Sequence, residues 1–250
     1  MEKDSTAFVN TKHTRFSGAT WYSSEQRQVL VGGAGGIGSW LSLLLSRANF
    51  ECVIYDNDTV EVHNIGGQLY STKNIGASKV QALKVVIENL SGTEPLIFNS
   101  WYGDKSMTHW YTFSCFDNMK ARKVMFEKWV KSIEMWDALP ERGIIPVFID
   151  GRLSLEHMQI FCVTPDNIEK YREHLFDDSE VAPLLCSMKQ TSHSAAMIAS
   201  HMMAFFTNHL SNEAEPFSRE VPFYWEYFIP LDLITIQNPV YDTTNKRENQ

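Results

Sequence analysis

The sequence contains few cysteines and no dense run of basic residues. The four cysteines among 250 residues form no CxxC pair, which excludes a four-cysteine zinc site. Cys52, Cys115 and Cys162 lie inside apolar strand-like runs, so we expect them to be small core residues. The formal net charge of -8 argues against nucleic-acid and anionic-membrane partners, because basic patches supply the affinity for both.

Long apolar runs are also missing. No stretch approaches the ~18 apolar residues that a membrane span requires. Residues 1–10 contain no apolar core of the kind found in a signal peptide. We therefore expect a reduced, cytoplasmic protein without a membrane partner. Hydrophobic residues still make up 44% of the chain, which is enough to build a folded core.

Strand-like and helix-like segments alternate along most of the chain. The strand-like run 28–33, the helix-like run 38–50 and the strand-like run 51–56 have the combined length of a βαβ unit. The strand-like runs 143–153 and 157–165 follow each other directly, which favours an antiparallel extension. This order predicts an α/β fold: a doubly wound, Rossmann-like, mostly parallel sheet with an antiparallel extension and a small C-terminal appendage.

A glycine-rich loop joins the first predicted strand to the first predicted helix. Gly33, Gly35 and Gly38 match the pattern G-x-G-x-x-G, whose glycines permit a tight turn, backbone approach to phosphate and close helix–strand packing. The helix start offers free N–H groups to an anion. Asp56 ends the second strand, about 20 residues further on, where an acidic residue holds ribose hydroxyls. A nicotinamide dinucleotide and ATP fit this loop equally well.

Four motifs follow one another between residues 29 and 122. The first is the loop of Gly33, Gly35, Gly36 and Gly38. The others comprise Asp56, Asp58, Val60, Glu61, Asn64 and Gln68, then Gly76 and Lys79, then Asp117, Asn118, Ala121 and Arg122. In this order and spacing the motifs resemble those of the ThiF/MoeB and ubiquitin-activating enzyme superfamily. The short chain resembles a compact, bacterial- or phage-type member.

The resemblance implies an adenylyltransferase that uses ATP and Mg²⁺. In this family a protein or peptide carboxylate attacks the α-phosphate of ATP, which yields an acyl-adenylate and pyrophosphate. By resemblance, Asp56 holds the ribose and Lys79 pairs with phosphate. Asp117 holds Mg²⁺, and Asn64 orders the phosphates. Taken alone, Lys79 is typical of a solvated helix lysine and Asp117 of a helix cap.

The resemblance also assigns the remaining nucleotide-binding positions. Asp58, Gln68 and the loop glycines belong to this set. Asn118 and Arg122 are expected to hold the strand–helix junction instead of touching the substrate.

One family position differs in a way that bears on activity. The arginine that neutralises triphosphate charge in the family falls on Gly67 here, and glycine cannot supply that charge. Arg152 is one candidate replacement. Arg15 is another, because relatives carry an arginine near the N-terminus that reaches into the partner subunit of a dimer. The alternative for Arg15 is an ordinary surface arginine.

Some relatives pass the activated carboxylate to a cysteine. Cys186 lies just before a predicted helix, and a helix N-terminus lowers the pKa of a thiol, so it is the candidate nucleophile. The alternative is a buried, inert cysteine. In relatives this stretch crosses over the adenylate, so Lys189 and Gln190 are candidates for lining a substrate channel.

By resemblance the substrate is a small ubiquitin-like or sulfur-carrier protein with a glycine-ended tail, because glycine threads a narrow channel without steric cost. The resemblance also implies a homodimer. An NAD-dependent oxidoreductase stays open as an alternative, although Lys79 and the motif around Asp117 argue against it. A non-catalytic nucleotide-binding scaffold of the same fold is the other alternative, and Gly67 favours it.

The expected domain organisation has three parts. Residues 1–27 form an N-terminal arm, and residues 28–180 form an ATP-binding, Rossmann-like adenylation domain. Residues 181–250 contribute a crossover loop, a buried helix and a C-terminal strand-like appendage packed on the same domain.

Overall fold

One eight-stranded sheet organises the protein. The computed structural model describes residues 12–136, 143–177 and 190–238. The strand order is β3-β2-β1-β4-β5-β6-β7-β8. The strands are β1 (Arg27–Gly32), β2 (Phe50–Tyr55), β3 (Leu96–Phe98), β4 (Tyr111–Ser114), β5 (Val147–Ser154), β6 (His157–Val163), β7 (Tyr224–Phe228) and β8 (Leu233–Gln237).

The sheet has a parallel half and an antiparallel half. Strands β3, β2, β1, β4 and β5 pair in parallel, as expected for successive βαβ units. Strands β6, β7 and β8 then add antiparallel, each joined to the strand before it. This confirms the predicted fold class, including the antiparallel extension.

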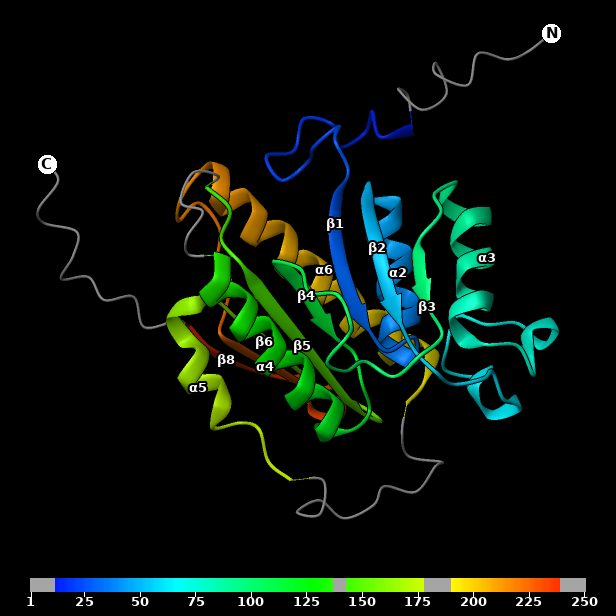
Figure 1. The fold of residues 1–250 in the computed structure, drawn as a ribbon. Coiled ribbons are helices and arrows are strands. Elements are labelled where there is room, and N and C mark those ends of the chain that lie inside the picture. Colours follow the sequence, from blue (N-terminus) through cyan, green and yellow to red (C-terminus); the bar gives the residue numbers. More distant parts are fainter. Residues whose placement is uncertain (1–11, 137–142, 178–189, 239–250) are drawn as a thin grey trace, which may run out of the picture.

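Helices cover both faces of the sheet (Figure 1). They are α2 (Gly36–Arg47), α3 (Lys79–Ser91), α4 (Met119–Trp136), α5 (Ile168–Arg172) and α6 (Ser192–Ala214). Helices α2, α3 and α6 pack on one face, where α2 lies against both others, and α4 and α5 pack on the opposite face. Each helix carries an apolar stripe because its buried residues recur with helical spacing.

The two faces have separate hydrophobic cores. Leu41 and Leu45 of α2 pack with Met202 and Phe206 of α6 in the first core. The second core is aromatic, and it is built from Phe126, Trp129, Phe148, Tyr171 and Phe223 among others. Cys52, Cys115 and Cys162 are buried free thiols, which confirms that they are small core residues.

The ends of the sheet have different roles. The carboxyl ends of β1, β2 and β3 point toward the lower edge of Figure 1, and the N-terminal segment lies at the opposite end. That segment is fixed there by a hydrogen bond from Thr20 Oγ1 to Ser211 Oγ (2.9 Å) and by Asn49, which donates to the carbonyl of Ser23 (2.9 Å). Ligands of open α/β sheets bind at the carboxyl ends of the strands, so the N-terminal segment lies away from that region.

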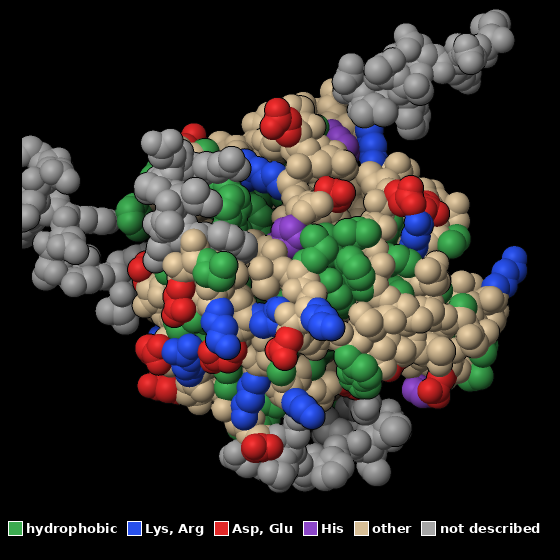
Figure 2. Space-filling view, in the orientation of Figure 1, with side chains coloured by type: hydrophobic (Ala, Val, Ile, Leu, Met, Phe, Trp, Pro, Cys, Tyr) green, Lys and Arg blue, Asp and Glu red, His purple; other side chains and the backbone are tan. Residues whose placement is uncertain are grey.

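Within the described ranges, no helix is both long enough and apolar enough to cross a membrane. Figure 2 shows Lys and Arg side chains interspersed with Asp and Glu over α4 and α5, so this face carries no patch of a single sign.

Candidate functional site

A cavity of about 1230 Å³ opens at the carboxyl ends of the parallel strands. Most of the residues singled out in the sequence line it: Gly33, Gly35, Gly36, Asp56, Asp58, Asn64, Gln68, Lys79, Asp117 and Arg152. The fold therefore brings motifs that are far apart in the sequence to one place. Gly38 does not line the cavity.

The glycines of the loop carry out distinct structural tasks. Gly33 has a φ of 93°, and a Cβ there would also lie only 2.8 Å from the carbonyl oxygen of Cys115. A Cβ on Gly38 would lie 1.8 Å from the carbonyl oxygen of Gly33, so glycine allows α2 to start directly on the loop. Gly35 has open space at its Cβ position and lines the cavity. The first turn of α2 therefore faces the cavity with free backbone N–H groups.

Asp56 is held at the end of β2 by backbone donors. Its Oδ2 accepts a hydrogen bond from the N–H of Ala34 in the glycine loop (2.7 Å), and its Oδ1 accepts from the N–H of Asp58 (2.8 Å). Burial raises the pKa of Asp56 above its usual value, against the lowering effect of the Ala34 N–H and of Lys79. The carboxylate is thus fixed beside the loop, and its remaining lone pairs can accept hydrogen bonds from a ligand in the cavity.

Lys79 is not a solvated helix lysine. Its side chain is only 8% exposed, and its Nζ lies 2.8 Å from Oδ2 of Asp58, whose side chain is 57% exposed. The N–H of Lys79 also donates to the carbonyl of Asp58 (2.9 Å). The first residue of α3 is thereby held in the cavity wall, where an incoming phosphate would compete with Asp58 for the ammonium group.

The side chains of Asn64 and Gln68 differ in their hydrogen bonding. Asn64 Oδ1 accepts from the N–H of Glu61 (2.8 Å) and closes a single 3₁₀ turn, Val62–Asn64. Gln68 is 9% exposed, and its Oε1 has no hydrogen-bond partner among the described residues. A buried acceptor without a partner is costly, so this atom is suited to contact a bound ligand.

The short segment between β4 and α4 presents Asp117 to the cavity. Asn118 caps α4, because its Oδ1 accepts from the N–H of Ala121 (2.9 Å). The Arg122 guanidinium donates hydrogen bonds to the carboxylate of Asp150 and to the carbonyls of Gly151 and Phe116. Asn118 and Arg122 therefore secure the strand–helix junction, as the sequence indicated.

The described residues contain no cluster of three or more His, Cys, Asp or Glu side chains that could hold a metal ion. Mg²⁺ is commonly bound by one or two carboxylates together with substrate phosphates, and it keeps several waters. A single exposed carboxylate such as Asp117, facing the cavity, fits that mode of binding.

Arg152 lines the cavity, but its guanidinium is already engaged. Nε donates to Asp150 Oδ2 (2.7 Å), Nη1 donates to the carbonyl of His174 (3.1 Å), and the group lies 4.6 Å from the ring centre of Phe161. Asp150 also pairs with Arg122, so one buried carboxylate serves two guanidinium groups. With two guanidinium groups and one carboxylate, this three-residue network keeps one positive charge in excess.

Arg15 is exposed on the N-terminal segment and does not line the cavity of its own chain. Cys186 and Lys189 lie outside the described residues. Gln190 lines the cavity, as expected for the stretch before α6. Cys115 lines it as well, but burial raises the pKa of its thiol well above the ordinary value, which disfavours a nucleophilic thiolate.

The cavity continues along the antiparallel half of the sheet, where sequence reasoning had assigned no site residues. His157 and Gln159 line this part, and His157 Nε2 lies 2.6 Å from Glu226 Oε1 on the neighbouring strand β7. The alternation of polar and apolar residues from His157 to Ile160 is the sequence signal for a half-exposed strand face. Trp101, 72% exposed, also lines the cavity.

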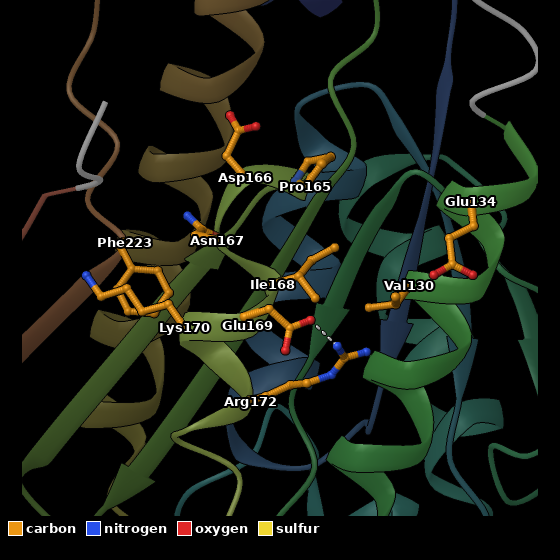
Figure 3. A pocket seen from close by; sticks show the side chains of 10 residues that line it. All are labelled: Val130, Glu134, Pro165, Asp166, Asn167, Ile168, Glu169, Lys170, Arg172 and Phe223. Atoms are coloured by element: carbon orange, nitrogen blue, oxygen red, sulfur yellow. Dashed lines mark hydrogen bonds and ion pairs between the residues drawn. The ribbon is translucent and has the colours of Figure 1, made fainter. Parts of the chain in front are cut away.

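A second cavity, of about 330 Å³, lies between α4 and α5 (Figure 3). Val130, Ile168 and Phe223 form its apolar lining. Arg172, which also lines it, pairs with Glu169 and with Glu127 (3.0 Å). Its guanidinium is therefore neutralised within the protein, and nothing comparable to the glycine loop faces this cavity.

Comparison with known proteins identifies the fold and the family. E. coli MccB solved with ATP has a TM-score of 0.62 and 16% identity over 93% of this chain and 66% of its own, so the chain spans less than two thirds of MccB. PaaA has a TM-score of 0.63 and 16% identity over 95% of this chain and 74% of its own. E. coli TcdA, a tRNA N6-threonylcarbamoyladenosine dehydratase, has a TM-score of 0.62 and 15% identity over 86% of this chain and 99% of its own.

No curated protein matches the chain at a significant level. The sequence profile of the ThiF family matches residues 15–239, which include every motif around the large cavity. This chain therefore belongs to the ThiF family.

Proposed function

We propose that the protein uses ATP and Mg²⁺ to adenylate the C-terminal carboxylate of a small protein. The observation that carries this proposal is the convergence of the glycine loop, Asp56, Lys79 and Asp117 on one cavity in a member of the ThiF family. A buried lysine in the cavity wall suits adenylyl transfer, which requires charge neutralisation, more than hydride transfer to a nicotinamide. The neighbour MccB has been solved both with ATP and with AMPCPP and MccA, which supports ATP and a peptide-like substrate.

The proposed reaction joins a carboxylate oxygen to the α-phosphorus and breaks the bond to the leaving pyrophosphate. Such transfers require charge neutralisation and alignment more than covalent help. Lys79 and the N-terminus of α2 supply positive potential, and Asp56 positions the ribose. Mg²⁺, held by Asp117 and the phosphates, would neutralise the charge on pyrophosphate. Asn64 and Gln68 complete the contacts to the nucleotide.

The length of the cavity supports a substrate that enters as an extended tail. The lining runs from Gly35 past Arg152 to His157 and Phe176 on the antiparallel side. We propose that a glycine-ended tail of a ubiquitin-like or sulfur-carrier protein lies along this wall. A covalent step, if the reaction includes one, would use Cys186, because the described cysteines are all buried.

We also propose that the protein acts as a homodimer in the cytoplasm. Arg15 lies away from the cavity of its own chain, so it can serve only the cavity of another copy. The arm 1–27, the adenylation domain 28–180 and the C-terminal part 181–250 remain the proposed division of the chain.

Exchange of labelled pyrophosphate into ATP tests the proposal. The assay contains the protein, ATP, Mg²⁺ and the small-protein fraction of the cells that encode it. Adenylation is reversible, so exchange should occur and should disappear with Lys79→Ala, but not with Lys84→Ala on the same helix. Treating the fraction with carboxypeptidase removes C-terminal tails and should abolish exchange. Exchange that survives this treatment would argue against a C-terminal carboxylate.

A non-catalytic scaffold is the second candidate, and Gly67 is the observation that favours it. This function predicts that ATP binds without any pyrophosphate exchange in the same assay.

A further inference from the structure

Gly67 occupies the position at which the family resemblance places an arginine, and the structure shows what fills the space beside it. A Cβ at Gly67 would lie 3.0 Å from Cγ and 3.2 Å from Nε2 of Gln190. A Cβ at Gly36, in the glycine loop, would lie 1.7 Å from Oε1 of the same side chain. The Gln190 amide therefore lies between the phosphate loop and the position of the lost side chain.

The backbone around this amide is fixed from both sides. Gln190 forms an isolated parallel bridge with Leu155, which follows β5. The next residue, Thr191, caps α6 by accepting a hydrogen bond from the N–H of Ser194 (3.3 Å). On the other side, Trp40 Nε1 donates to the carbonyl of Gly67 (3.4 Å). The Gln190 side chain thus projects from a defined anchor toward the glycine loop.

We infer that Gln190 is the phosphate-binding side chain that takes the place of the missing arginine. This inference rests on the proposed function. The amide nitrogen carries two N–H donors and lies 2.8 Å from the Cβ position of Gly36, while Oε1 lies nearest the loop. A half-turn of the terminal amide brings these N–H groups to the loop over which the phosphates of ATP would bind. Glycine at position 67 and glutamine at position 190 are complementary, because any side chain at 67 would press against Gln190. A neutral amide supplies hydrogen bonds without the charge of a guanidinium.

Calorimetric titration of ATP–Mg²⁺ into the full chain tests this assignment. Gln190→Ala should weaken ATP binding about tenfold, since a hydrogen bond to a charged group contributes more than a neutral one. Gln190→Glu keeps the size of the side chain but brings a negative charge to the phosphates, so it should weaken binding further. Gln81→Ala, an exposed glutamine on α3 outside the cavity, is the matched control and should bind like the wild type.

A double variant tests whether Gln190 replaces the function of the missing arginine or only fills the space beside Gly67. In the double variant Gly67→Arg, Gln190→Ala, the new arginine has room and should restore ATP affinity to within about threefold of the wild type. Thermal melting without nucleotide verifies that each variant is folded. The inference is overturned if Gln190→Ala binds ATP as tightly as the wild type, or more tightly. A wild type that does not bind ATP would instead overturn the proposed function itself.

Discussion

At the scale of single residues, Asp56 links the glycine loop to the end of β2 at the edge of the large cavity. Both carboxylate oxygens accept backbone N–H groups, one from the loop and one from Asp58. The side chain therefore holds the loop in shape and presents its remaining lone pairs to the cavity. Burial raises its pKa, so the protein keeps a carboxylate where a neutral group would be easier to bury.

Asp56→Asn should separate these two roles. Asparagine has only one acceptor oxygen, so one of the two N–H groups loses its partner, at a cost of about 1 kcal/mol in the free energy of unfolding. The ribose contact should suffer more, and ATP affinity should fall by about tenfold. Wild-type protein should prefer ATP over 2′-deoxy-ATP in competition titrations, and the variant should lose that preference. An unchanged preference would show that Asp56 does not contact the ribose.

Local chemistry made many single-residue assignments predictable from the sequence. The glycine loop and Asp56, which both line the cavity, depend on residues close together in the chain. The contact of Gln190 with Gly36 and Gly67 was not predictable, because it depends on how α6 and the segment before it fold back over the sheet. Arg152 was a candidate for the cation that replaces the missing arginine, but the sequence did not indicate that Asp150 and His174 engage its guanidinium.

At the scale of elements, the buried carboxylate of Asp150 joins three of them. It lies on β5, fully buried, and pairs with Arg122 of α4 and Arg152 of β5, while it accepts a hydrogen bond from Tyr171 OH of α5 (2.9 Å). Burial alone would raise the pKa of Asp150, but the two guanidinium groups and the tyrosine hold it below the ordinary 3.8. This network fixes the wall of the cavity to the helix layer.

Asp150→Asn should destabilise the protein by about 3–5 kcal/mol at pH 7, because it leaves two buried guanidinium groups without their counterion. Because the folded-state pKa lies below the unfolded one, the stabilisation is present above pH 3.8 and is lost as the pH falls through the folded value. Urea unfolding should therefore show a gap between wild type and variant at pH 7 that narrows below about pH 4. A gap that is constant with pH would contradict an ionised Asp150.

The order of the elements followed from the sequence, but their boundaries did not: the helix-like run 38–50 corresponds to α2, Gly36–Arg47, and β2 already begins at Phe50. The runs 143–153 and 157–165 were expected to pair as an antiparallel extension, and β5 and β6 do so. The part of the cavity wall formed by β5 and β6 was not predicted. The pairing register of the two strands decides which of their side chains face the cavity, and the sequence does not show that register. Arg152 pairs with Gln159, and Gln159 faces Glu226 on β7, so this polar row becomes visible only when three strands are aligned.

At the scale of the whole molecule, mixing an Arg15 variant with a Lys79 variant tests the proposed dimer. A variant with Arg15→Ala retains Lys79, and a variant with Lys79→Ala retains Arg15. If Arg15 serves the cavity of the partner, a mixed dimer contains one complete site. Equal mixing with free exchange of subunits should then recover about a quarter of wild-type pyrophosphate exchange, although each variant alone has little. No recovery in verified mixed dimers would show that Arg15 does not act across an interface.

The central claim is that the large cavity binds ATP and not a nicotinamide dinucleotide. Thermal stabilisation by ATP–Mg²⁺, NAD⁺ and NADH, measured on wild type, Lys79→Ala and the control Lys84→Ala, tests it most directly. ATP–Mg²⁺ at about 100 times its Kd should add about 2.7 kcal/mol to the stability of the wild type and of Lys84→Ala. Lys79→Ala should lose most of that gain, and neither dinucleotide should stabilise any of the three. Stabilisation by NAD⁺ or NADH alone would contradict the account and assign the glycine loop to an oxidoreductase.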